Sequence, residues 1–256
     1  MRKSYIFAVF VSLILSVIVF ADEPQVTIRF EGNDPHEEIN SQIELIGDQG
    51  KRVLLNVYEP SLLSSPATTH DILLTTLPVI SKDAYATKFP GETMLAQVGE
   101  IKREGVMIRG IASAHRANDP IREVNGTNYI FLIEMAGLRI VDLGGIGQNQ
   151  LTPEQLKAMG TVDIALAPIF NQVNGMNIIS LKGFNILDQI QPKLIIPISL
   201  DIDTAKYAAE KWRATYLDNV EMKISKERLP KKTEILFMGP KGKLYGNALK
   251  LKKAAY

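Results

Sequence analysis

The residues that could do metal or acid–base chemistry in this chain are few and widely separated. Three histidines stand at positions 36, 70 and 115 of the 256 residues, and there is no cysteine. No two histidines have the i, i+2 or i, i+4 spacing that brings two imidazoles to one metal ion. The sequence therefore predicts no compact imidazole site. The missing cysteines exclude a thiolate metal site and a thiol nucleophile.

Other catalytic motifs are also absent from the sequence. There is no Gly-x-Ser-x-Gly elbow and no phosphate loop, and the glycines at 144, 145 and 147 lack the spacing of a dinucleotide fingerprint. His115 and Asp142 remain as candidate functional residues. Each has a structural alternative: His115 as a buried packing histidine, and Asp142 as a turn carboxylate that accepts backbone amides. Asp201 and Asp203 precede a predicted helix and are expected to cap it.

The elements that must position these residues follow from hydrophobic periodicity. Alternating or short apolar runs predict strands at 25–30, 41–46, 52–57, 71–76, 106–113, 129–134, 138–143, 162–167, 194–197 and 235–238. Helical patterns cover 152–160, 179–190 and 204–216, the first with Thr152 as cap and Pro153 at the first helical position. A mostly β first half followed by alternating strands and helices predicts a mixed sheet covered by helices.

An ordered series of motifs resembles the metallo-β-lactamase-fold hydrolases, especially the branch related to the L-ascorbate-6-phosphate lactonases. The series is GKRVLLN (50–56), DILLT (71–75), IASAH (111–115), NYIFLIE (128–134), GLRIVDLGGIG (137–147), LTPEQL (151–156), VDIALAP (162–168) and PKLIIP (192–197). The resemblance implies an α/β fold, a four-layer αββα sandwich, with the site in loops between the sheets. It also implies one or two metal ions that generate hydroxide from bound water.

At the positions where that family carries metal ligands, this chain holds other residues. Thr76 and Pro78 stand for the first two histidines, and Ile80 and Ser81 stand for an Asp-His pair. The bridging aspartate falls on Gly145, the residue matching its neighbouring histidine is Asp142, and the late histidine falls on Ser199. Only His115 remains. The expectation is no metal site and no cofactor, since zinc favours imidazole and thiolate over lone carboxylates.

The N-terminus has the pattern of a secretory signal. Arg2 and Lys3 precede an apolar run over 5–20, and small or apolar residues before Asp22 predict cleavage after Ala21. We therefore expect a leader over 1–21, one domain over 22–256, and export to a periplasm or the exterior. The alternative is an uncleaved membrane anchor, although the apolar run is short for a bilayer core of about 30 Å.

Charge is divided unevenly along the rest of the chain. Residues 22–222 carry 17 basic and 26 acidic residues, whereas 223–256 carry 10 basic and 2 acidic residues. This division excludes a uniformly basic nucleic-acid binder and leaves two interpretations of the C-terminal stretch, a solvated face or a weak contact with an anionic surface. Its paired or spaced lysines are Lys231, Lys232, Lys241, Lys243, Lys250, Lys252 and Lys253.

Two functions are compatible with these observations. The first is a degenerate, exported pseudoenzyme that binds a small molecule or a protein in the former metal cleft. The residues predicted to line that cleft are Thr76, Pro78, Ser81, His115, Asp142, Gly145 and Ser199. The second is a hydrolase of a small ester, lactone or phosphoester with a rebuilt site around His115 and Asp142, aided by a carboxylate such as Asp83 or Asp119.

Overall fold

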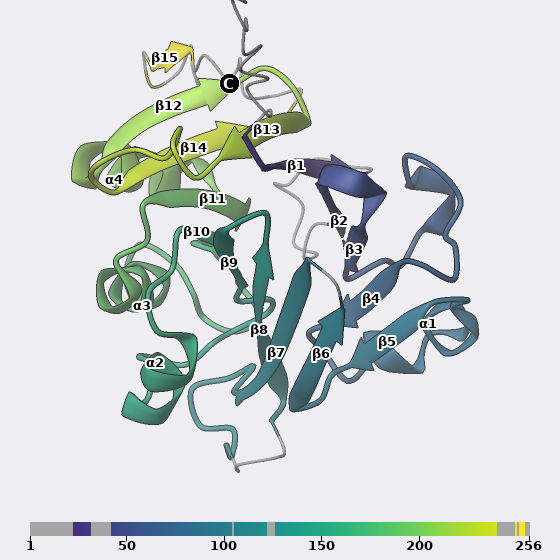
Figure 1. Cartoon of the computed structure of the whole chain (residues 1–256). Helices are drawn as coiled ribbons and strands as arrows, with labels where there is room; N and C mark the ends of the chain where they lie inside the picture. Colours follow the sequence, from purple (N-terminus) through teal and green to yellow (C-terminus); the bar gives the residue numbers. More distant parts are fainter. Residues whose placement is uncertain are drawn as a thin grey trace, which may run out of the picture.

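Two β-sheets pack face to face and carry helices on their outer faces (Figure 1). The structure is a computed structural model that describes residues 23–31, 42–103, 105–121, 126–239, 249 and 251–253. The predicted α/β class and αββα layering are confirmed. The predicted leader, His36 and the lysines at 241, 243 and 250 lie outside the described residues.

The first sheet contains six strands among the described residues. In spatial order they are β13 (Glu221–Ser225), β1 (Gln25–Glu31), β2 (Gln42–Gly47), β3 (Arg52–Leu55), β4 (Ile72–Thr75) and β5 (Glu92–Leu95). Pairing is antiparallel from β13 to β3 and parallel from β3 to β5. The carboxyl ends of β3, β4 and β5 therefore lie at one edge of the sandwich.

The second sheet contains nine strands among the described residues. In spatial order they are β15 (Lys252–Lys253), β12 (Arg213–Leu217), β14 (Glu234–Met238), β11 (Leu194–Ser199), β10 (Ile164–Pro168), β9 (Leu138–Asp142), β8 (Asn128–Met135), β7 (Val106–Ser113) and β6 (Gly99–Arg103). Pairing is antiparallel from β6 to β9 and parallel from β9 to β15. As predicted, this sheet is mixed.

Short helices cover both outer faces. They are α1 (Ala84–Lys88), α2 (Pro153–Met159), α3 (Lys182–Ile190) and α4 (Ile202–Lys211), with 3-10 turns at Asp48–Gly50, Pro60–Leu62 and Ile80–Lys82. Capping boxes begin two of them, Thr152 with Gln155 in α2 and Asp201 with Thr204 in α4. The sequence predicted Thr152 and Asp201 as caps because each precedes the helix with a side chain that can accept from a free backbone amide.

The prediction of a helix over 204–216 is wrong for the residues after Lys211. The α4 helix ends at Lys211, Trp212 is extended, and the following residues form β12, which pairs in parallel with β14. Burial alternates along β12, so hydrogen bonding to β14 and packing override the helical periodicity. The α3 helix also begins three residues later than predicted, at Lys182, and α1, β5, β6 and β13 were not predicted.

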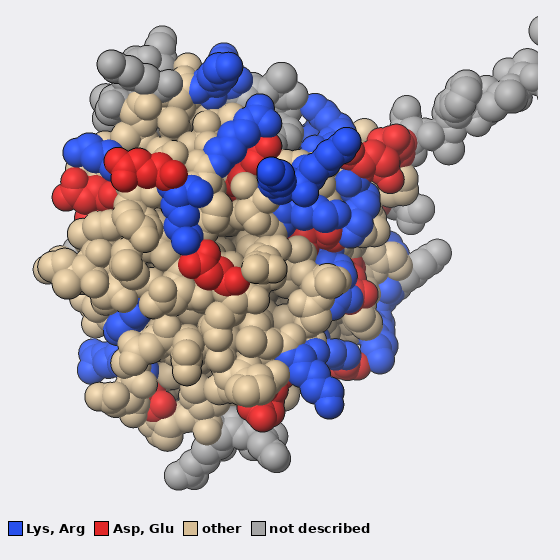
Figure 2. Space-filling model, turned by 90° about the vertical axis from the view of Figure 1, so that its left-hand side faces the viewer, with Lys and Arg blue, Asp and Glu red and all other residues tan. Residues whose placement is uncertain are grey.

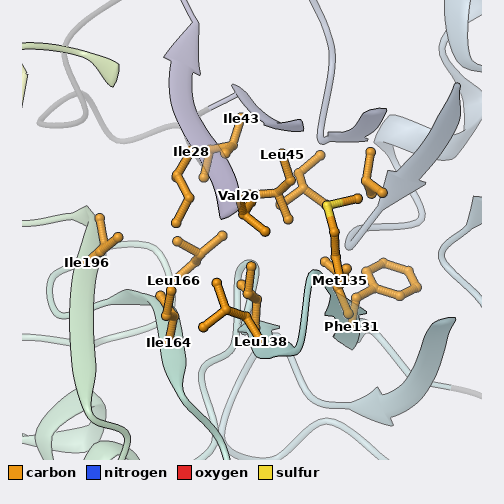
Figure 3. Packing of buried hydrophobic residues seen from close by; sticks show 14 of the residues in the cluster. Val26, Ile28, Ile43, Leu45, Phe131, Met135, Leu138, Ile164, Leu166 and Ile196 are labelled. Carbon is orange, nitrogen blue, oxygen red and sulfur yellow. The ribbon is translucent and has the colours of Figure 1, made fainter. Parts of the chain in front are cut away.

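The main core lies between the two sheets and explains why the strands take this register. Figure 3 shows Val26, Ile28 and Leu45 of the first sheet meeting Leu138 and Leu166 of the second. All five side chains are fully buried, each contributing about 1.5 to 3 kcal/mol of apolar burial. A second cluster lies between the nine-stranded sheet and α2, α3 and α4, and a third lies between β3, β4 and α1. Among the described residues, no helix is long and apolar enough to cross a membrane.

Candidate functional site

Polar side chains lie at the edge of the sandwich where parallel strands of both sheets end. Asn56 follows β3 and Thr76 follows β4, while Asp142 ends β9 and Ser199 ends β11. All four side chains are buried, with at most 1% of their surface exposed. We call the cluster formed by these residues and Gly144 the corner. Its position corresponds to the carboxyl strand ends, where α/β sheets place their ligands.

Asp142 is the charged residue at the centre of the corner. Its Oδ1 accepts the backbone N–H of Gly144 at 2.9 Å, as the sequence predicted for a turn carboxylate. Its Oδ2 accepts the Asn56 amide from the opposite sheet at 3.3 Å. Burial raises the pKa of Asp142 to about 6, against the lowering effect of these two donors. The carboxyl group can therefore change protonation state near neutral pH inside the fold.

Thr76 bonds to the same asparagine as Asp142. Its backbone N–H and its hydroxyl both donate to Asn56 Oδ1, at 2.8 and 2.9 Å. Gly144 lies directly against it, so closely that a Cβ added at Gly144 would stand 2.3 Å from the Thr76 Cβ. Gly144 also has a φ of +55°, which favours glycine. The corner is thus filled by a threonine that fits only against a residue without a side chain.

His115 lies beside the corner in the loop after β7 and is half-buried. Its Nδ1 is 2.7 Å from the carbonyl oxygen of Gly145, which can only accept, so Nδ1 carries the proton. In the neutral ring, Nε2 is then the basic nitrogen. Asp119 lies in the same loop and is joined to the backbone of His115 through Thr127: the backbone N–H of His115 donates to the Thr127 hydroxyl, and that hydroxyl donates to Asp119 at 2.6 Å. The Thr127 hydroxyl lowers the pKa of Asp119.

Three further polar residues support the loop of Gly144 and Gly145 and were not predicted. The Asn128 amide donates to the carbonyl of Leu143 at 3.0 Å, and its oxygen accepts the N–H of Gly145 at 2.9 Å. Ser113 accepts a second bond from Asn128, and Asn174 donates to the carbonyl of Ile146 at 2.9 Å. A polar residue beginning the apolar strand β8 was the available signal for Asn128. No local pattern marks Asn174.

The remaining predicted cleft residues are distributed differently. The backbone of Gly145 bonds to two side chains: its carbonyl oxygen accepts from His115 Nδ1, and its N–H donates to the Asn128 side-chain oxygen. The Ser199 hydroxyl is buried and has no hydrogen-bond partner among the described residues. Pro78 and Ser81 form a half-exposed turn in which the Ser81 hydroxyl donates to the Pro78 carbonyl at 2.7 Å. Asp83 caps α1 through the N–H of Tyr85.

The side-chain groups at the corner do not fit as ligands of a divalent metal ion such as zinc. In the part of the chain that the structure describes, no three side chains from His, Asp and Glu gather at one point. The corner offers one carboxylate, one amide and hydroxyls, and the nearby imidazole already uses Nδ1. Zinc sites in proteins are built from imidazole, thiolate and carboxylate, with three or four such ligands.

Comparison with known proteins identifies the family. A model described as "Beta-lactamase superfamily domain" matches residues 43–199, which is more than half of the chain. The chain belongs to the β-lactamase superfamily. No curated protein matches this superfamily member.

A solved structure agrees with this assignment at the level of the fold. A protein of Thermotoga maritima, described as a candidate Zn-dependent hydrolase of the metallo-β-lactamase superfamily, is 19% identical with a TM-score of 0.60, covering 84% of this chain and 98% of its own. Two other structures are less similar. A diphosphatase from the PhnP family is 9% identical with a TM-score of 0.44, covering 83% and 94%. Zn(2+)-bound PqqB from Methylobacterium extorquens is 12% identical with a TM-score of 0.36, covering 56% and 71%.

Basic residues of this superfamily member gather away from the corner. Lys231 and Lys232 line a surface cavity of about 490 Å³ together with Lys193 and Trp212. Lys252 and Lys253 lie in β15, beside β12. Figure 2 shows the face turned to the left in Figure 1, where Lys and Arg side chains are densest at the upper right, interspersed with Asp and Glu, beside a broad area without charged residues.

Proposed function

We propose that this superfamily member is a pseudoenzyme that works without a metal ion and binds a small molecule or a protein. The observation that carries the proposal is the contact of Thr76 with Gly144, completed by Asn56 and Asp142, which fills the corner with protein atoms. Metal-hydroxide chemistry needs an open coordination position and several nitrogen or carboxylate ligands. A filled corner with one carboxylate supplies neither.

The resemblance to the L-ascorbate-6-phosphate lactonase branch supports the same proposal. Of the seven ligand positions that this resemblance implies, His115 alone keeps its histidine, and the other six hold different residues, at positions 76, 78, 80, 81, 145 and 199. The remaining polar groups mostly bond one another, as in the bonds of Asn56 to Thr76 and Asp142. Such a network stabilises the two sheets against each other and keeps the loops at the corner in place for binding. We further propose export, on the basis of the leader pattern over 1–21.

Metal content tests this proposal directly. The purified protein is incubated with zinc, manganese or iron, desalted, and analysed by inductively coupled plasma mass spectrometry, beside the His115→Ala variant and a His70→Ala control. His70 is exposed and precedes β4, so it lies at the opposite end of that strand from Thr76. We expect far less than one metal ion per chain in all three proteins. Near-stoichiometric metal that is lost in His115→Ala and kept in His70→Ala would refute the proposal.

A hydrolase centred on His115 is the second candidate. It is favoured by the Nδ1 contact with the Gly145 carbonyl, which leaves Nε2 as a base, and by Asp119 in the same loop. The test is a screen of small esters, lactones and phosphodiesters with and without chelator. Activity that His115→Ala removes and His70→Ala keeps would establish this candidate. Activity that survives His115→Ala would reject it.

A further inference from the structure

A groove of about 620 Å³ lies on the outer face of the nine-stranded sheet, between its β6 edge and α2. Its volume is within the range of about 300 to 1,000 Å³ that is typical of small-molecule sites. Val98 and Ile121 stand at its mouth with 37% and 39% of their surface exposed, and Ile111, Ala112 and Ala158 form its walls. The groove therefore presents apolar surface to solvent beside α2.

The polar groups that line the groove are already engaged within the protein. Gln155 donates to the carbonyl of Ala112 at 2.8 Å and accepts the N–H of Thr152 at 2.9 Å, and it exchanges two further bonds with Gln148. Arg109 donates to the carbonyl of Ala158. Because these donors and acceptors are satisfied, the walls offer a ligand mainly apolar contact.

Charged groups reach the groove from three elements. Glu100 of β6 forms an ion pair with Arg109 of β7, so these two lining charges compensate one another, and Lys102, which also pairs with Glu100, does not line the groove. Glu154 of α2 is exposed, and its own backbone N–H and the Thr152 hydroxyl lower its pKa, so it is ionised at neutral pH. Among the described residues, no lysine or arginine forms an ion pair with Glu154. A negative charge at the rim disfavours an anionic ligand.

We propose that this groove is a binding site for a neutral, apolar small molecule. The site is separate from the corner and does not depend on whether the corner holds a metal ion. The failure of this proposal and the failure of the metal-free function can therefore be told apart. Apolar burial against Val98, Ile111 and Ile121 supplies the affinity. The carboxylate of Glu154 supplies discrimination against anions.

Two related dyes test the proposal in solution. N-phenyl-1-naphthylamine is neutral, and 8-anilino-1-naphthalenesulfonate adds a sulfonate to the same framework. Fluorescence titration of the purified protein is expected to give one saturable site for the neutral dye and at least tenfold weaker binding for the anionic dye. Glu154→Gln is expected to narrow that difference by strengthening binding of the anionic dye.

Matched variants locate the site. Ile121→Asp places a charge in the apolar mouth and is expected to weaken binding of the neutral dye at least tenfold. Ile179→Asp is the control, because Ile179 is 90% exposed and does not line the groove. Both positions are on the surface, so the fold tolerates both changes, and circular dichroism checks this. Ala158→Phe fills the groove, and dye titration of this variant gives a second test of the same site.

Three outcomes would overturn the proposal. The first is the absence of saturable binding of the neutral dye. The second is equal weakening by Ile121→Asp and Ile179→Asp, which would mean nonspecific adsorption. The third is a dimer in sedimentation velocity that Ile121→Asp dissolves, which would make a second copy of the chain the occupant of the groove.

Discussion

Replacing Asp142 by asparagine tests the electrostatics of the corner most directly. The structure buries this carboxyl group completely and raises its pKa from 3.8 to about 6. Because one pKa unit corresponds to about 1.4 kcal/mol, keeping the carboxylate ionised in the folded protein costs about 3 kcal/mol above pH 6. The asparagine side chain is neutral and avoids this cost. It loses about 1 kcal/mol of hydrogen bonding, because its NH₂ group replaces one of the two oxygens that accept from Asn56 and Gly144.

The sign of the effect changes with pH. The folded state binds the proton of Asp142 more tightly than the unfolded state, so this group's contribution to stability is full below pH 3.8 and is lost as pH rises through 6. Asp142→Asn is therefore expected to be more stable than the parent protein by about 2 kcal/mol at pH 8. At pH 4 it is expected to be equal or slightly less stable. The difference between the two proteins changes by about 2 to 3 kcal/mol over this range.

Urea unfolding followed by circular dichroism at pH values from 4 to 8 measures this difference. Asp163→Asn is the control, because Asp163 is also buried but forms ion pairs with Lys226 and Lys193 and accepts the N–H of Arg139. The control is expected to lose stability at pH 8. A pH-independent difference for Asp142→Asn, or a less stable variant at pH 8, would show that the Asp142 carboxylate is not penalised by burial.

Two further substitutions test the packing of the corner and of the first sheet. Gly144→Ala is expected to lower the free energy of unfolding by about 2 to 4 kcal/mol, because the added Cβ meets Thr76 and the φ of residue 144 is positive. In a double-mutant cycle, Thr76→Gly should recover at least about 1 kcal/mol of this loss. Strictly additive effects of the two changes would contradict the contact between Thr76 and Gly144. Arg52→Met is expected to lower the free energy of unfolding by about 3 to 5 kcal/mol, because it leaves the buried Asp71 without its ion-pair partner. The control Arg213→Met changes a side chain that is 73% exposed and should alter the stability measured in urea by less than about 0.5 kcal/mol. Equal effects of the two variants would argue against the buried pair.

The sequence predicted much of the fold because period-2 patterns and caps are local signals. Strands such as Val106–Ser113 and the Thr152 cap of α2 can be located within a window of a few residues. The end of α4 could not be predicted, because β12 forms only by pairing with β14. In that pair, Arg213 of β12 lies opposite Glu234 of β14. Short strands such as β5 and β6 also depend on neighbours that are distant in the sequence.

The site was predicted in part. The sequence alone determined that imidazole and thiolate ligands are scarce, that Asp142 begins a turn, and that His115 follows a strand. Only the tertiary structure decided that Asp142 meets Asn56, 86 residues away, and that Thr76 lies against Gly144. The physical reason is that residue types are fixed by the sequence, whereas burial and the neighbours that set a pKa exist only after two sheets have packed together.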